Sequence, residues 1–316
     1  MEKKFVSVVI YLHNDEERIV PFLDKVFDVV FNSFEQYELV CVDDGCTDGT
    51  VPAMKEYMKK KEKQGVFSIV HMGFYQGIEA AMNAGRDASI GDFVYEFDSI
   101  VGDFDHGLIM ELYETMLSGY DIVSASPSGK TRFTSRLFYT VFNGSSRAGI
   151  KLDTESFRIL SRRAINRIKS MGAYIPYRKA VYASCGLRTT LVKYESTISP
   201  KERKMMKKKA TNRFERSQIA LDSFIYFTNI MEKLSAGISV LFLLLFLGIG
   251  VYSIVDYFIN GTAIEGWTST VCLVAIGFFG IFIILTIILK YLSVLLDLVF
   301  KKQKYLVADI EKIVSQ

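Results

Sequence analysis

The chain has 316 residues, 50 % of them hydrophobic, and a formal net charge of +3. This length is sufficient for a complete α/β core, but a mean hydropathy of +0.21 is high for a purely soluble protein. The composition therefore argues against a purely soluble chain, and nucleic acid is not expected among its partners.

Short apolar runs alternate with amphipathic stretches through the first hundred residues. Strands are expected over 5–12, 37–42, 66–71 and 92–97, and helices over 15–30, 50–63 and 78–89. A strand–helix rhythm of this kind predicts a doubly wound, mostly parallel α/β sheet. We assign it to a domain at residues 1–200.

Polar side chains follow the predicted strands directly. They are Asn14, Asp15, Asp43, Asp44 and Asp98. In a doubly wound sheet the ligand lies beyond the carboxyl ends of the strands, so carboxylates there indicate ribose hydroxyls, a base edge or a divalent cation. Helix capping is the alternative for Asp15. Neither a Gly-x-Gly-x-x-Gly turn nor a P-loop motif is present, which removes the main support for a dinucleotide or P-loop protein.

Two stretches near the C-terminus, 236–254 and 267–289, contain no charged residue. Each is close to the ~20 residues that a helix needs to cross ~30 Å of hydrocarbon. We predict transmembrane helices over 235–259 and 266–292. Two buried helices of a soluble core are the alternative, but such helices normally carry a polar stripe.

The charges that flank these stretches predict their orientation. Lysines and arginines crowd the preceding segment, 201–234, and recur in the tail, 293–316, whereas the intervening residues contain Asp256 and Glu265 and no basic residue. The positive-inside rule then predicts a multi-pass protein of the cell (inner) membrane with a cytoplasmic catalytic domain. The basic segment, interfacial and amphipathic, serves either topology and membrane adhesion or phosphate binding.

Three motifs resemble those of a known enzyme family. Residues 7–16 read SVVIYLHNDE, residues 42–50 read VDDGCTDGT, and residues 156–163 read SFRILSRR. They are similar to elements of the family 2 glycosyltransferases, specifically of dolichol-phosphate mannose synthases and bacterial polyprenyl-phosphate glycosyltransferases. The resemblance extends over essentially the whole chain and implies a GT-A-type fold.

The same resemblance implies an activity. It is the inverting transfer of a sugar from a nucleoside diphosphate to a polyprenyl phosphate on the cytoplasmic leaflet, for cell-surface polysaccharide or glycoconjugate assembly. A UDP-sugar is the preferred donor and a GDP-sugar the next, and a homo-oligomer is implied. The alternative is a degenerate relative that binds nucleotide sugar or lipid as an assembly or scaffold partner.

Site residues follow from the same resemblance. The implied nucleotide-sugar site comprises Tyr11, His13, Asp15, Val42, Asp44, Gln76, Asp98, Ser99, Arg203 and Lys209. The implied catalytic residues are Asp98, Asp103 and Arg158. Arg132, Arg136 and Arg158 are candidates for the acceptor phosphate, with ordinary surface or packing roles as the alternative for each.

The metal motif departs from the family pattern of alternating carboxylates. Asp98 is retained, but Ile100 and Gly102 follow it, and neither offers a side-chain oxygen to Mg²⁺ or Mn²⁺. Three hypotheses remain open. Asp98 rebuilds a metal site with Asp103 or Asp105, the basic segment replaces the cation, or the protein binds its ligands without transfer.

Overall fold

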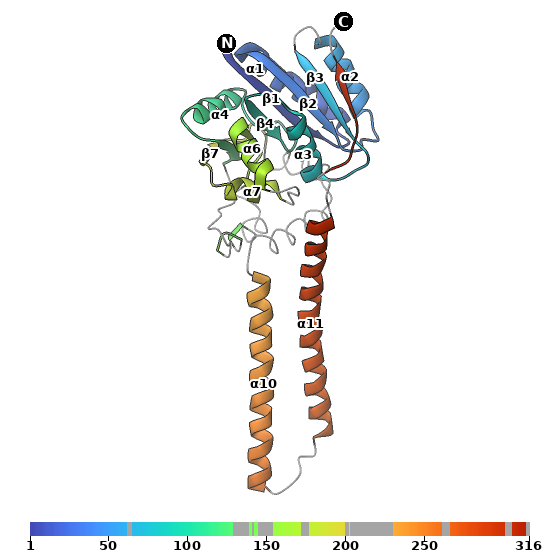
Figure 1. Ribbon diagram of the computed structural model, residues 1–316, viewed down its shortest axis with the longest axis vertical. Coiled ribbons are helices and arrows are strands. Elements are labelled where there is room, and N and C mark those ends of the chain that lie inside the picture. Colours follow the sequence, from blue (N-terminus) through green and yellow to red (C-terminus); the bar gives the residue numbers. More distant parts are fainter. Residues whose placement is uncertain are drawn as a thin grey trace.

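The computed structural model describes residues 1–61, 65–128, 139–140, 142–144, 154–171, 177–199, 202, 230–260, 266–300 and 305–313. The strands are β1 (Glu2–Leu12), β2 (Phe34–Asp43), β3 (Val66–Met72), β4 (Phe93–Phe97), β5 (Ile122–Pro127), β6 (Phe157–Ser161), β7 (Thr189–Tyr194) and β8 (Val307–Ile313). The helices are α1 (Glu16–Ser33), α2 (Thr50–Lys61), α3 (Ile78–Ala88), α4 (Gly107–Leu117), α6 (Arg162–Met171), α7 (Arg178–Ser184), α10 (Ile230–Asn260) and α11 (Trp267–Phe300). Figure 1 shows an α/β domain from which two long helices extend.

The strands form one mixed sheet in the order β7-β5-β6-β4-β1-β2-β3-β8. Strands β3, β2, β1 and β4 are parallel neighbours, as the sequence predicts. Strand β6 runs antiparallel to both β4 and β5, whereas β5 and β7 are parallel. The predicted α/β fold is confirmed, and the antiparallel strands lie outside the region in which strands and helices alternate regularly.

Both faces of the sheet are covered because the central strands are apolar on both sides. Along β1, Val8 and Ile10 pack in the cluster that includes α1 and α4, whereas Val9 and Tyr11 pack in the cluster that includes α3. Helix α3 lies close to the sheet at Gly85. An added Cβ there would lie 2.5 Å from the Val9 and Val42 side chains, so the close approach requires glycine.

The C-terminal segment returns to the domain. Strand β8 pairs antiparallel with β3, with His71 opposite Asp309. Because β8 begins just after α11 in the chain, the carboxyl end of β3 lies at the end of the domain that α11 approaches (Figure 1). The carboxyl ends of the parallel strands therefore face the two long helices.

Helices α10 and α11 cover the two stretches that the sequence predicts as membrane spans. In the described part of the chain, no helix combines the length and the apolar character that crossing a membrane requires. The two predicted spans are therefore not confirmed. Helix α11 continues to Phe300, past the predicted boundary at residue 292.

Candidate functional site

The loops after β1 and β2 are locked together at the carboxyl end of the sheet. Asn14 adopts a positive φ of 55°, and its Oδ1 accepts a hydrogen bond from Thr47 N at 2.8 Å. Asp43 Oδ1 accepts one from Cys46 N at 2.8 Å. Burial raises the pKa of the Cys46 thiol to about 12, so it stays protonated at neutral pH. Two motifs identified in the sequence are thus one structural unit.

Asp44 organises the loop that leads into α3. It is fully buried, its Oδ1 accepts from Gln76 N at 2.8 Å, and its Oδ2 accepts from Gly77 N at 2.9 Å and from the Tyr11 hydroxyl at 3.1 Å. Burial raises the pKa of Asp44, and these donors oppose the increase. Gly77 supplies the positive φ of 86° that the turn requires.

His13 and Tyr75 form an aromatic pair next to Asp44. Their ring centroids are 4.5 Å apart, and His13 Nδ1 lies 2.8 Å from the Asp44 carbonyl oxygen. Both rings are partly exposed, so they offer a flat surface for a planar ligand such as a nucleobase. Asp15 is buried beside them, and its N–H donates to Thr50 Oγ1 at 2.7 Å.

The structure brings together five of the predicted donor residues: Tyr11, His13, Asp15, Asp44 and Gln76. The Val42 side chain lies instead in the core between the sheet and α3, so it offers a pocket no side-chain surface. Arg203, Lys209, Arg132 and Arg136 lie outside the described residues. The roles predicted for these four residues stay predictions.

Asp98 lies at the end of β4 and is held by two arginines from different elements. Arg158 of β6 donates through Nη2 to Asp98 Oδ2 at 2.7 Å, and Arg178 of α7 donates through Nη2 to Asp98 Oδ1 at 2.7 Å. Each arginine also donates through Nη1 to Glu96 Oε2 at 2.9 Å. Glu96 and Asp98 are two residues apart on one strand, so their side chains lie on the same face.

Further polar groups surround this cluster. The Tyr182 hydroxyl donates to Glu96 Oε1 at 2.8 Å and accepts from Arg86 Nη1 at 2.9 Å. The outer nitrogens are also bonded: Arg178 Nε donates to Glu79 Oε2 at 2.9 Å, and Arg158 Nε donates to Glu155 Oε2 at 3.1 Å. The buried charges are thus paired and hydrogen-bonded, as burial requires.

The electrostatics fix Asp98 in its ionised form. Burial disfavours the charged carboxylate, but the guanidinium groups of Arg158 and Arg178 outweigh it and hold the pKa of Asp98 well below its usual range. Both arginine side chains are at most 1 % exposed, whereas that of Asp98 is 16 % exposed. Asp98 can therefore accept a hydrogen bond from a ligand at the rim, but Arg158 cannot reach an acceptor phosphate without leaving its partners.

The residues that follow Asp98 do not supply a second cation ligand. Ile100 is buried in the hydrophobic core, and Asp103 accepts from the Tyr194 hydroxyl at 3.0 Å and Ser196 Oγ at 3.2 Å. Asp105 Oδ2 accepts from Gly107 N at 3.0 Å, at the start of α4.

Over the described residues, no group of three or more potential ligand side chains could hold a metal ion. The arrangement around Asp98 therefore does not fit a divalent cation held by protein carboxylates. Asp103 instead accepts from the hydroxyls of Tyr194 and Ser196, and Asp105 accepts from a backbone N–H at the start of α4.

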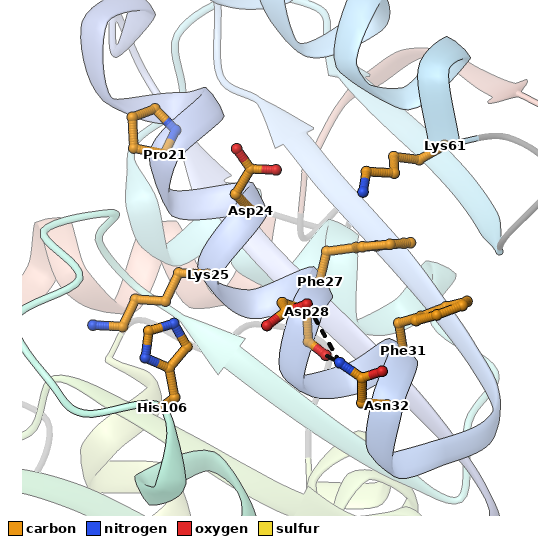
Figure 2. Close-up of a pocket in the computed structure, with 9 residues that line it drawn as sticks. All are labelled: Pro21, Asp24, Lys25, Phe27, Asp28, Phe31, Asn32, Lys61 and His106. Carbon is orange, nitrogen blue, oxygen red and sulfur yellow. Dashed lines mark hydrogen bonds between the residues drawn. The ribbon is translucent and has the colours of Figure 1, made fainter.

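One hollow of the described surface is separate from this site. It measures about 600 Å³, lies against the outer face of α1 and contains none of the predicted site residues (Figure 2). One of its residues, Lys25, donates to the carbonyl oxygens of Gly102 and Phe104 and so fastens the segment after Asp98 to α1. A smaller hollow of about 220 Å³ includes Asn14 and Asp15 at the rim.

Sequence reasoning missed Glu96, Arg178, Tyr182 and Arg86. The two-residue spacing between Glu96 and Asp98 on a predicted strand was a usable signal for Glu96. No motif marks Arg178 or Tyr182, which reach the cluster from a short helix more than 80 residues later in the chain.

The family model for glycosyl transferase family 2 matches residues 7–168, just over half of the chain. An uncharacterized glycosyltransferase of Synechocystis sp. is 28 % identical over 96 % of this chain and 95 % of its own length. A prophage bactoprenol glucosyl transferase homolog of Escherichia coli is 26 % identical over 87 % of this chain and 88 % of its own length. The chain belongs to glycosyl transferase family 2, and the predicted glycosyltransferase class is confirmed.

Solved structures support the same fold. Glucosyl-3-phosphoglycerate synthase of Mycobacterium tuberculosis, in complex with Mn²⁺, UDP and glucosyl-3-phosphoglycerate, gives a TM-score of 0.51 at 16 % identity, with 70 % of this chain and 78 % of that chain covered. At this identity the likeness concerns the fold alone. It agrees with the predicted GT-A-type architecture.

Proposed function

We propose that this glycosyltransferase moves a sugar, with inversion, from a nucleoside diphosphate sugar to a polyprenyl phosphate at the cytoplasmic face of the cell membrane. The observation that carries the proposal is the position of the candidate site. The rim that holds His13, Asp44 and Asp98 faces the end of the domain approached by α11. Relatives named bactoprenol glucosyl transferase, 25 % identical over 87 % of this chain, support a polyprenyl acceptor.

The donor half of the site has groups for each part of a nucleotide sugar. The His13–Tyr75 pair offers a stacking surface for the base, and the exposed edge of Asp98 offers an ionised acceptor for hydroxyl groups. Asp44 and Tyr11 hold the loop between them in place. A UDP-sugar is the preferred donor, which the UDP complex of the structural relative supports, and a GDP-sugar is the next.

The two long helices support a lipid acceptor. Large apolar side chains are exposed along both, for example Phe258 at 81 % on α10 and Phe279 at 66 % on α11. Large apolar side chains that are exposed along two neighbouring helices favour contact with lipid over contact with water. We therefore retain membrane spans at 235–259 and 266–292 as part of the proposal, together with the homo-oligomer that the family resemblance implies.

The chemistry demands little proton transfer from the protein. A phosphate monoester oxygen is already anionic near neutral pH, so alignment of the nucleophile matters more than a general base. In this proposal Asp98 contacts the donor, Arg158 and Arg178 position Asp98, and Asp103 fastens the end of β7. Arg132 and Arg136 remain the candidates for the acceptor phosphate.

The family resemblance implies Mg²⁺ or Mn²⁺, and the structural relative was solved with Mn²⁺. Asp98 is the carboxylate of the family metal motif that this chain retains. Both of its oxygens are paired with arginines. No step of the proposed reaction is therefore routed through a metal ion.

Sugar transfer from a panel of radiolabelled nucleotide sugars to polyprenyl phosphate in vesicles tests the proposal. We expect product with one UDP-sugar, and loss of product in Asp98→Asn but not in the control Glu56→Gln, whose side chain is 71 % exposed on α2. Parallel assays with EDTA and with added Mn²⁺ measure the metal requirement. Nucleotide binding without transfer to any lipid phosphate would replace the proposal with the scaffold alternative.

A further inference from the structure

The loop between β3 and α3 exposes large apolar side chains at the carboxyl rim. Phe74 is 59 % exposed, and the neighbouring Tyr75 is partly exposed. Leu306, in the segment that enters β8, is 45 % exposed. We call Phe74, Tyr75 and Leu306 the rim patch. Exposed apolar residues that gather at one place on a domain commonly mark a contact surface.

Backbone and side-chain hydrogen bonds join the two parts of the rim patch. Gly73 N donates to the Leu306 carbonyl oxygen at 3.0 Å, and Gln76 Nε2 donates to the same oxygen at 2.7 Å. Leu306 N donates in return to Gln76 Oε1 at 2.8 Å. The loop and the segment entering β8 therefore form one fixed surface, although 230 residues separate Gln76 and Leu306 in sequence.

The place of this surface in the chain indicates what covers it. Leu306 follows the end of α11 at Phe300, and the intervening sequence contributes Lys301, Lys302 and Lys304. Lysines that are close in sequence to an apolar surface favour the headgroups of anionic lipids, and aromatic residues favour the interfacial layer. A lipid surface fits this combination of charge and apolar side chains.

We propose that the rim patch inserts Phe74 and Leu306 into the interfacial layer of the lipid bilayer. This inference rests on the proposed membrane function and adds a contact that lies outside both long helices. The contact has a consequence for the donor site, because the same loop donates from Gln76 N and Gly77 N to Asp44 and places Tyr75 against His13. Lipid contact at Phe74 thus holds the donor pocket, which the same loop shapes, next to the bilayer surface, where a membrane-embedded acceptor reaches it.

Depth-dependent quenching tests the contact directly. Phe74→Trp and Val66→Trp are each made in a Trp267→Phe background, which removes the chain's single native tryptophan. Val66 is a matched control because it is 47 % exposed and begins β3, whereas Phe74 follows the other end of that strand. Both proteins are placed in vesicles of anionic phospholipid with or without bromine on the acyl chains.

We expect bromine to quench most of the emission of the Phe74→Trp protein and to leave that of the Val66→Trp protein unchanged. Flotation of the vesicles distinguishes the two levels of the proposal. A protein that floats without quenching at position 74 overturns the rim-patch contact and leaves the proposed function intact. A protein that does not float with the vesicles overturns the membrane part of the function and the rim-patch contact together.

Introducing a negative charge at position 74 supplies the functional readout. We expect Phe74→Asp to reduce transfer to a long-chain acceptor embedded in vesicles by several-fold, while transfer to a short-chain, water-soluble acceptor analogue is unchanged. Ile90→Asp is the control, because Ile90 is exposed but precedes β4 at the opposite end of the sheet. Equal losses with both acceptors would assign Phe74 to the donor pocket and reject the lipid contact.

Discussion

Arg178 donates through Nη2 to Asp98 Oδ1 at 2.7 Å, although the two residues are 80 positions apart in sequence. Its Nη1 reaches Glu96 on the same strand, at 2.9 Å. One guanidinium thus spans two carboxylates that project from one face of β4, and Arg158 does the same from the neighbouring strand. The geometry of Asp98 depends on both arginines.

Truncation of Arg178 should be strongly destabilising. Arg178→Ala leaves Glu96 and Asp98 with one guanidinium instead of two in a buried site, and breaking a buried ion pair costs about 3–5 kcal/mol. Arg178→Lys keeps the charge but lacks the planar fork that contacts both carboxylates, so we expect it to fold with reduced transfer activity. Chemical denaturation and transfer assays measure the two effects.

Lys60→Ala is the matched control for Arg178. Lys60 pairs with Glu56 on the surface of α2, with side chains 70 % and 71 % exposed, and such solvent-exposed pairs contribute little to stability. Equal stability losses at Lys60 and Arg178 would show that the buried cluster has no special role.

The pH dependence of stability should reflect the ionisation of Asp98. Its pKa is depressed in the folded protein, so the stability that it contributes is complete above its unfolded value near 3.8 and is lost as the pH falls toward the folded value. Asp98→Asn removes this contribution. We expect the difference in unfolding temperature between wild type and Asp98→Asn to be constant from pH 7 to 5 and to shrink below about pH 4. A difference that grows on acidification would contradict the assignment.

Restoring a carboxylate at position 100 should not restore a metal site. Ile100 packs in the core with Phe104 and Phe22, so Ile100→Asp buries a charge or a protonated acid among apolar side chains. We expect a loss of stability of about 3 kcal/mol or more and no Mn²⁺-dependent rise in unfolding temperature. Ile100→Val, which keeps the apolar side chain, should cost only about 1 kcal/mol. A Mn²⁺-dependent stabilisation of Ile100→Asp would show that the segment can turn toward Asp98.

The loop between β3 and α3 should become less rigid when Asp44, which accepts hydrogen bonds from its backbone, is substituted. Asp44→Asn replaces one acceptor oxygen by an NH₂ donor facing Gln76 N or Gly77 N, so one backbone hydrogen bond is lost. Tyr11→Phe removes a single hydrogen bond to the same carboxylate. We expect UDP affinity, measured by calorimetry, to fall roughly ten-fold or more in Asp44→Asn and less in Tyr11→Phe. Unchanged affinity in both variants would remove this loop from the donor site.

Much of the fold is readable from local pattern. Apolar strands that alternate with amphipathic helices predict β1 to β4 and α1 to α3 to within a few residues, because buried parallel strands and helices have different periods. The acidic rim follows from the topology of a parallel sheet.

The partners of the rim residues are not readable in the same way. The sequence retains Asp98 and leaves a cation beside it as one of three hypotheses, but the identity of its neighbours depends on where β6 and α7 place Arg158 and Arg178. Antiparallel pairing of β4 with β6 sets Glu96 opposite Arg158, a relationship between distant segments that no local pattern contains. The sequence predicts Arg158 as a ligand of the acceptor phosphate, with a surface or packing role as the alternative, and in the structure it is a buried partner of Asp98.

The two edge strands of the sheet, β7 and β8, are the points at which the domain connects to the long helices. The chain leaves β7 at one edge, passes through α10 and α11, and returns to β8 at the opposite edge. Near its return it is held by an ion pair between Glu311 and Lys55 and by the approach of Glu311 Oε2 to His71 Nε2 at 3.5 Å. The chain therefore connects the domain to the two long helices through both edges of its sheet rather than through one.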